Sequence, residues 1–138
     1  MAADSKTSLI KKYSLLVPVI FSLAIFYFSI IRSATITGPG DITIVVPISG
    51  TIMHLGSYFI LSFAWFFYFK IKKIEKTLLT AALVAGIYGL FIESIQYLIP
   101  YRVFQIQDAI TNFIGAFLIY PIIYMLPKKL RGYLKSKK

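Results

Sequence analysis

The sequence contains no cysteine, only five acidic residues and a single histidine. Without cysteine the chain can form no disulfide, no thiolate metal site and no cysteine nucleophile. The Gly-x-Ser-x-Gly motif of serine hydrolases and the glycine-rich phosphate loop are also missing. No motif for an activated nucleophile is therefore present, and any acid–base chemistry depends on the few carboxylates and the histidine.

Hydrophobic residues make up 58% of the 138-residue chain, whereas soluble domains contain about 45–50% apolar residues. The length allows one domain. Four stretches, interrupted by few charges, are long enough to cross a bilayer as helices, which takes about 20 residues each; they cover residues 13–31, 51–69, 77–99 and 108–126. The first is longer than the apolar core of an ordinary signal peptide. We therefore predict an all-α polytopic membrane protein, a single domain of residues 1–138 that forms a bundle of four transmembrane helices.

The positive charges predict the orientation of this bundle. Thirteen of the fifteen basic residues lie before the first helix, between the second and third, or after the fourth; only Arg32 and Arg102 remain for the opposite side. Basic residues next to membrane helices favour the cytoplasm. We therefore expect both termini to be cytoplasmic and the protein to lie in the plasma membrane. The net charge of +10 then reflects topology rather than nucleic-acid binding.

The polar residues of the apolar part of the chain are concentrated in "ESIQYLIPYRVFQIQDAITNFIG", residues 93–115. On the third predicted helix, one helical face carries Gly86, Gly89, Glu93 and Gln96. On the fourth, one face carries Asp108, Asn112 and Gly115. Small residues allow membrane helices to approach closely, so we expect these two faces to meet, with Arg102 in the short loop that joins the helices.

The second predicted helix adds a third polar face near the same membrane boundary. His54 lies one turn inside that end of the helix, with Tyr58 and Ser62 one and two turns further along. The three helices should therefore bring their polar residues together at the outer membrane interface.

These residues resemble the pattern of the VanZ-like membrane protein family. "HLGSY" at 54–58 supplies a His-x-x-x-Tyr, and residues 93–115 supply Glu-x-x-Gln, Pro-x-Arg and Asp-x-x-x-Asn-x-x-Gly. The resemblance covers residues 54–115; the first helix matches only as an apolar segment. It implies a small multi-helix membrane protein related to one that confers resistance to the lipoglycopeptide teicoplanin, but it supplies no reaction. The characteristic polar residues carried over by position are His54, Tyr58, Glu93, Gln96, Arg102, Asp108 and Asn112.

Most of these residues also have a purely structural interpretation. Asp108 could be the N-cap of its helix, Asn112 could hydrogen-bond between helices, and Tyr58 could belong to an aromatic belt. His54 could be a satisfied residue at the interface, and Arg102 could reach lipid phosphates. Glu93 is different, because a carboxylate at membrane depth costs about 2.5–3.5 kcal/mol on insertion scales and marks a functional site by default. Arg102 or His54 could be its counter-ion in a structural ion pair, but such pairs often add little net stability.

Glu93, His54 and Asp108 are the candidate acid–base residues, since an imidazole between two carboxylates can accept or donate a proton near neutral pH. Arg102, Gln96, Asn112 and Tyr58 are the candidate ligand-binding residues, with the Arg102 guanidinium suited to phosphate or carboxylate. His54, Glu93 and Asp108 could hold a divalent cation, but one histidine with dispersed carboxylates lacks the local spacing of a metal motif. We therefore expect neither a metal nor another cofactor.

Three functions of different kinds fit the sequence. The cluster could bind or modify an anionic lipid-linked or amphiphilic molecule of the cell envelope, it could gate proton-linked transport, or it could serve an accessory, structural role. Its position on one side of the membrane favours the first. The expected partner is thus a membrane lipid or a lipid-linked envelope molecule, with no nucleic acid involved.

Overall fold

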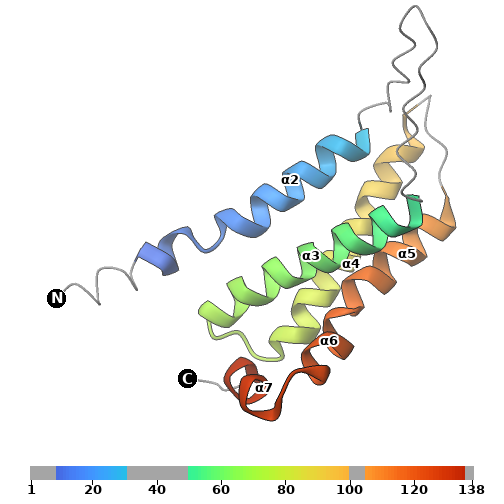
Figure 1. Ribbon diagram of the computed structural model, residues 1–138. Helices are drawn as coiled ribbons and strands as arrows, with labels where there is room; N and C mark the ends of the chain where they lie inside the picture. The colour runs from blue at the N-terminus through green and yellow to red at the C-terminus, as the bar shows by residue number, and fades with distance from the viewer. Residues whose placement is uncertain (1–8, 31–49, 100–104, 136–138) are drawn as a thin grey trace, which may run out of the picture.

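The computed structural model describes residues 9–30, 50–99 and 105–135 of the chain, with nothing but helices and the turns between them in these ranges. The helices are α2 (Leu16–Ile30), α3 (Gly50–Ile71), α4 (Thr77–Tyr97), α5 (Ile106–Phe117), α6 (Ile119–Met125) and α7 (Lys128–Lys135). Figure 1 shows that α2 to α6 lie roughly along one axis, with successive spans running in opposite directions. The predicted all-α class is confirmed.

The four predicted spans are also confirmed by length and composition. Segments long and apolar enough to cross a membrane are Leu9–Ile30, Gly50–Ile71, Thr77–Tyr97 and Ile106–Met125. Two of them are interrupted at prolines. Pro18 and Pro121 each lack the amide hydrogen that would bond four residues back, and the helical geometry breaks at Ser14 and Leu15 and again at Leu118.

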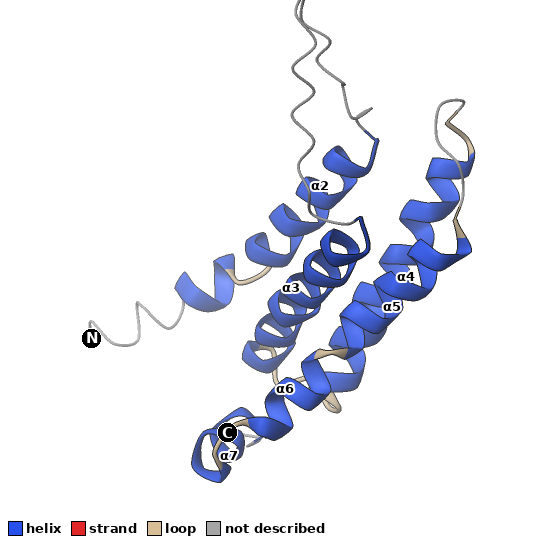
Figure 2. Ribbon diagram, turned by 45° about the vertical axis from the view of Figure 1, so that its right-hand side comes forward, coloured by secondary structure: helices blue, strands red, loops and turns tan. Residues whose placement is uncertain are grey.

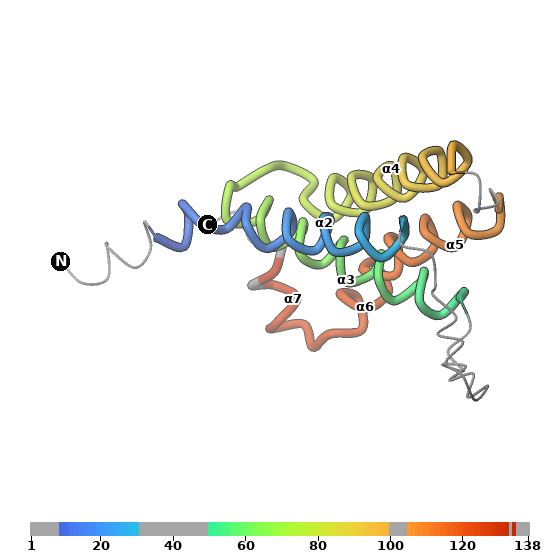
Figure 3. Tube along the Cα trace, turned by 90° about the horizontal axis from the view of Figure 1, so that it is seen from above, coloured from blue at the N-terminus to red at the C-terminus, as the bar shows by residue number. Residues whose placement is uncertain are grey.

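Three helices, α3, α4 and α5, form the tightly packed part of the bundle (Figure 3). Small side chains permit this packing, as the sequence predicted. The face of α4 toward the bundle is rich in alanine and glycine, and its buried residues are Ala81, Ala82, Ala85, Gly86, Gly89, Ile92, Glu93 and Gln96. On α5, the buried residues are Ala109, Asn112, Gly115 and Ala116. Both predicted polar faces therefore point into the bundle.

The first span packs more loosely than the others. Helix α2 lies along the outside of the bundle, against α3 and to a smaller extent α4 (Figures 1 and 2). Pro18 is its only fully buried residue. A hydrogen bond from the Tyr88 hydroxyl to the Ser22 carbonyl, 2.7 Å long, ties α2 to α4.

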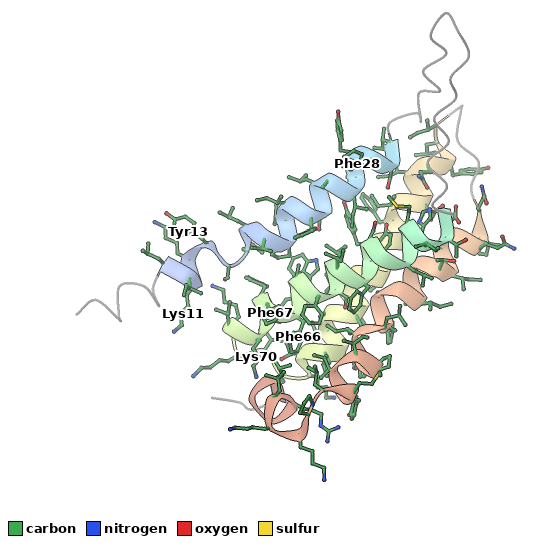
Figure 4. All side chains as sticks on the ribbon, in the orientation of Figure 1. Lys11, Tyr13, Phe28, Phe66, Phe67 and Lys70 are labelled. Carbon is green, nitrogen blue, oxygen red and sulfur yellow. The ribbon has the colours of Figure 1, made fainter. Side chains whose placement is uncertain are left out.

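The basic segments gather at one end of the bundle. The Lys72 ammonium donates to the Lys11 carbonyl at 3.4 Å, and the Lys70 ammonium donates to the Leu134 carbonyl of α7 at 2.5 Å. Lys11 and Lys70 lie at the end of the molecule away from Phe28 (Figure 4). The described parts of the three basic regions thus lie at one end of the bundle, as the charge pattern predicted, and the cytoplasmic location of that end stays a prediction.

Helix α7, in the basic C-terminal segment, has no counterpart among the four predicted helices. Leu134 packs against the apolar cluster of Phe66, Ala81, Ala82, Ile119 and Ile123. That cluster fills the half of the bundle near the basic end. The tail therefore begins as a helix with one apolar contact to the bundle rather than as a free polar extension.

We expect Gly115→Ala to lower the stability of the bundle by about 1–3 kcal/mol, the usual cost of overpacking. A Cβ atom at Gly115 would lie 2.6 Å from the Leu55 carbonyl oxygen and 2.9 Å from the Leu55 Cα, so α3 and α5 would have to separate. Thermal unfolding of the detergent-solubilised protein measures the loss. Gly56→Ala is the matched control, since a Cβ there meets nothing within 4 Å; equal stability of the two variants would contradict this packing.

Candidate functional site: a polar cluster beside an apolar groove

The candidate site lies at the end of the bundle opposite the basic segments. There α3 begins, α4 ends and α5 begins, so three helix ends meet (Figure 1). His54 comes from α3, Glu93 from α4, and Asp108 and Asn112 from α5. These four residues are called the polar cluster below. The predicted convergence of the three polar faces is therefore present in the fold.

His54 is the link between α3 and α5. Its Nδ1 atom lies 2.7 Å from the Asn112 side-chain oxygen, and its Nε2 atom lies 3.7 Å from Asp108 Oδ2. An amide oxygen can only accept a hydrogen bond, so Nδ1 carries a proton and donates it to Asn112. The His54 ring is thus oriented by Asn112, with Nε2 directed to the Asp108 side.

Glu93 is the most deeply buried charged residue among those the structure describes, with 1% of its surface exposed. Neither carboxylate oxygen has a hydrogen-bond partner within the described ranges. The Asn112 side-chain amide and the Gln105 backbone N–H approach this carboxylate without reaching hydrogen-bond geometry. A ligand atom of Glu93 nevertheless lies within 4.8 Å of those of His54 and Asp108.

Two predicted site residues point elsewhere. The Gln96 side-chain amide donates to the Ser29 carbonyl of α2 at 2.9 Å, so Gln96 joins α4 to α2 instead of joining the cluster. Tyr58 is buried, and its ring packs close to Gly89. The Tyr58 hydroxyl has no hydrogen-bond partner in the described part of the chain.

Tyr58 and Gln96 line a groove of about 370 Å³ between α2 and α3. Its walls are mostly apolar, and the polar side chains His54, Ser57, Tyr58, Ser29 and Gln96 contribute to the same surface. The apolar wall consists of Phe21, Ala24, Ile25, Phe28, Met53 and Ile60. His54 therefore belongs both to the groove and to the polar cluster.

The structural interpretation of Asp108 as an N-cap is wrong. Helix α5 begins at Ile106, two residues earlier than expected, and Gln105 occupies the N-cap position. Asp108 lies in the first turn, half-buried, with its carboxylate near His54. Arg102 lies outside the described residues, so its predicted role in head-group binding stays a prediction.

Sequence reasoning missed the groove residues Ser29 and Ser57. A usable signal was present, because each is a polar residue in an apolar helix. Each also lies near the helix end that is predicted at the same membrane interface as His54. What the sequence could not give is the distance between α2 and α3. That distance depends on how the side chains of two helices that are separate in the sequence pack against each other.

Four apolar spans with a largely buried polar cluster at one end define a small polytopic membrane protein. A family model described as VanZ/LLP1 matches residues 3–127. The match spans well over half of the chain, so the protein belongs to the VanZ/LLP1 family, and the resemblance drawn from its polar motifs is confirmed. No curated protein and no solved structure gives a significant match.

Proposed function

We propose that the protein binds an anionic amphiphile, a membrane lipid or a lipid-linked envelope molecule, at the end of the bundle that carries the polar cluster. His54 is the residue on which this proposal depends, because it lines the apolar groove and contacts the polar cluster at the same time. An apolar chain in the groove would place its polar end beside His54. Such a molecule would be held where it can be sequestered or modified.

The size and lining of the groove support this proposal. Small-molecule sites usually occupy about 300–1,000 Å³ and combine apolar walls with a few polar groups, and the groove of about 370 Å³ has both. Phe28 and Ile60, on its two walls, are strongly exposed. In a bilayer such exposed apolar residues contact lipid, so a lipid chain could enter between α2 and α3 without crossing water.

The anionic part of the proposal comes from Arg102, whose planar guanidinium suits a phosphate or carboxylate. Family membership adds a link to teicoplanin, a lipoglycopeptide with an apolar chain. Binding of an envelope amphiphile on the outer face of the plasma membrane would fit a role in resistance to such an antibiotic.

Transport is less well supported. A transport path needs polar groups through the depth of the membrane. The half of the bundle beyond the cluster is filled by Phe66, Ala81, Ala82, Ile119 and Ile123. Between the polar cluster and these apolar residues, the buried polar groups that the structure describes on α3 are Tyr58 and Ser62. A polar path through the full depth of the bundle is therefore not supported.

The proposal requires the cluster to face outward, which single-cysteine labelling tests directly because the natural chain has no cysteine. We expect Lys73→Cys and Lys138→Cys to react with a membrane-impermeant maleimide only after the cells are permeabilised. Asp41→Cys and Arg102→Cys should react in intact cells. Labelling of Lys73→Cys from outside intact cells would place the site on the cytoplasmic side and overturn this orientation.

Thermal unfolding in detergent with added lipid tests the anionic preference. We expect phosphatidylglycerol to raise the unfolding temperature more than phosphatidylcholine, since Arg102 would pair with the anionic head group. Arg102→Lys keeps the charge but loses the bidentate geometry, and it should reduce this difference while leaving the lipid-free protein as stable as before.

Arg131→Lys, in α7 at the other end of the bundle, is the matched control and should retain the full lipid effect. An equal response to both lipids in the parent protein would contradict the proposal. If Arg102 instead neutralises Glu93, then Arg102→Ala should destabilise the protein and Glu93→Gln should restore most of the loss in a double-mutant cycle.

A further inference from the structure

The polar cluster brings together three side chains that can bind a metal ion. His54, Glu93 and Asp108 each offer a ligand atom, and these atoms all lie within 4.8 Å of one another. They come from three different helices, which explains why the spacing along the chain predicts no metal motif. Residues that are far apart in the sequence can still lie side by side where the faces of their helices meet in the bundle.

The His54 ring has the orientation that a metal ligand needs. Metal-binding histidines usually donate one ring N–H to a fixed acceptor, which sets the tautomer and turns the other nitrogen to the ion. Asn112 provides this acceptor at 2.7 Å from Nδ1. The remaining nitrogen, Nε2, faces Asp108 Oδ2 at 3.7 Å, close to the separation of about 3.4 Å between two ligands of a tetrahedral zinc ion.

Glu93 supplies an independent indication that the cluster accepts a cation. Glu93 is 1% exposed, and one of its carboxylate oxygens lies within 4.8 Å of ligand atoms of His54 and Asp108. The Asn112 amide and the Gln105 backbone N–H approach the carboxylate, but neither oxygen makes a hydrogen bond of good geometry with a described residue. A buried carboxylate without a partner is costly. No lysine or arginine of the described ranges forms an ion pair with it. A divalent cation would satisfy Glu93 and balance the two negative charges of Glu93 and Asp108.

We propose that His54, Glu93 and Asp108 bind a divalent transition-metal ion of the zinc class, with Asn112 as the positioning residue for His54. One imidazole and two carboxylates favour such an ion over Mg²⁺ or Ca²⁺, which prefer oxygen ligands alone. Three protein ligands leave at least one coordination position open, as in catalytic zinc sites. His54 also lines the groove, so the open position would be near the polar end of a bound amphiphile.

The metal site does not depend on the proposed amphiphile, and it can be tested without one. Full-length protein without a polyhistidine tag is stripped with chelator in detergent and titrated with Zn²⁺ by calorimetry. We expect one Zn²⁺ per chain, with no comparable binding of Mg²⁺ or Ca²⁺. Added Co²⁺ should give the visible absorption bands of a low-symmetry protein site. Asn112→Ala should weaken Zn²⁺ binding about 10- to 100-fold, as loss of an outer-shell partner usually does.

Glu93→Gln and Asp108→Asn should each abolish the Zn²⁺ binding, and Asp108→Asn keeps the test available if the buried variant fails to fold. Glu75→Gln removes an exposed carboxylate from the loop between α3 and α4, and it should bind Zn²⁺ as the parent protein does. The metal proposal is overturned if the parent protein binds no Zn²⁺, or if the folded site variants bind it with unchanged affinity. Neither result would affect the amphiphile proposal, because lipid binding can be measured in the presence of chelator, when no metal is bound.

Discussion

Glu93→Gln is expected to abolish the cellular function of the protein while leaving its fold intact. Glutamine has nearly the size of glutamate, so the packing of α4 against α3 and α5 is retained. The change removes only the charge of a carboxylate that is buried and has no hydrogen bond from the described residues. The unfolding temperature should therefore stay the same or rise.

The functional loss follows from the position of Glu93 beside His54 and Asp108. Without the carboxylate the cluster loses both the proposed cation ligand and the predicted acid–base group. The measurement is the minimum inhibitory concentration of teicoplanin for a strain that lacks the protein and is complemented with either form. We expect the Glu93→Gln strain to be as sensitive as the uncomplemented strain.

Glu75→Gln is the matched control, because it removes the same charge from an exposed position and should complement fully. A fully active Glu93→Gln protein would show that the cluster only stabilises the bundle. In that case Gly89→Leu should still destroy the fold, because a Cβ at Gly89 already meets Asn112 Cβ at 2.8 Å.

Much of this architecture can be predicted from the sequence because membrane helices leave strong signals. The four spans follow from the length of the apolar stretches, and their ends agree with the structure to within a few residues. The inward polar faces follow from helical periodicity: Glu93 and Asn112 share their faces with Gly89 and Gly115, and all four are buried. The family could be predicted as well, since it depends on motifs within these faces.

The direction of individual side chains could not be predicted. Gln96 shares a face with Glu93, yet it bonds to Ser29 of α2, because α2 packs against that edge of α4. Periodicity assigns a residue to a face but not to a neighbouring helix. The same limit hid the groove and the closeness of His54, Glu93 and Asp108, since both depend on how separate helices are placed.

Filling the groove should abolish amphiphile binding. Ala24 lies on α2 in the wall of the groove, and Ala24→Trp would occupy the space between α2 and α3. Helix α2 is loosely packed, so the bundle of α3, α4 and α5 should remain folded. We expect binding to weaken by at least about tenfold, or about 1.4 kcal/mol.

Leu23→Trp is the matched control for this change. Leu23 is the neighbouring residue of the same helix, 61% exposed and absent from the groove lining. In the bilayer its side chain contacts lipid, so a larger apolar group there should be tolerated. Amphiphile binding by Leu23→Trp should equal that of the parent protein.

Photolabelling tests the central claim, that an amphiphile occupies the groove, most directly. The parent protein, Ala24→Trp and Leu23→Trp are each reconstituted with an anionic lipid that carries a photoactivatable group near its head, and the labelled peptides are mapped by mass spectrometry. We predict that label concentrates on residues 53–60 and on the groove face of α2 in the parent and Leu23→Trp proteins, and that Ala24→Trp loses it. Label spread evenly over lipid-facing residues such as Ile87 and Phe91, and unchanged by Ala24→Trp, would contradict the account.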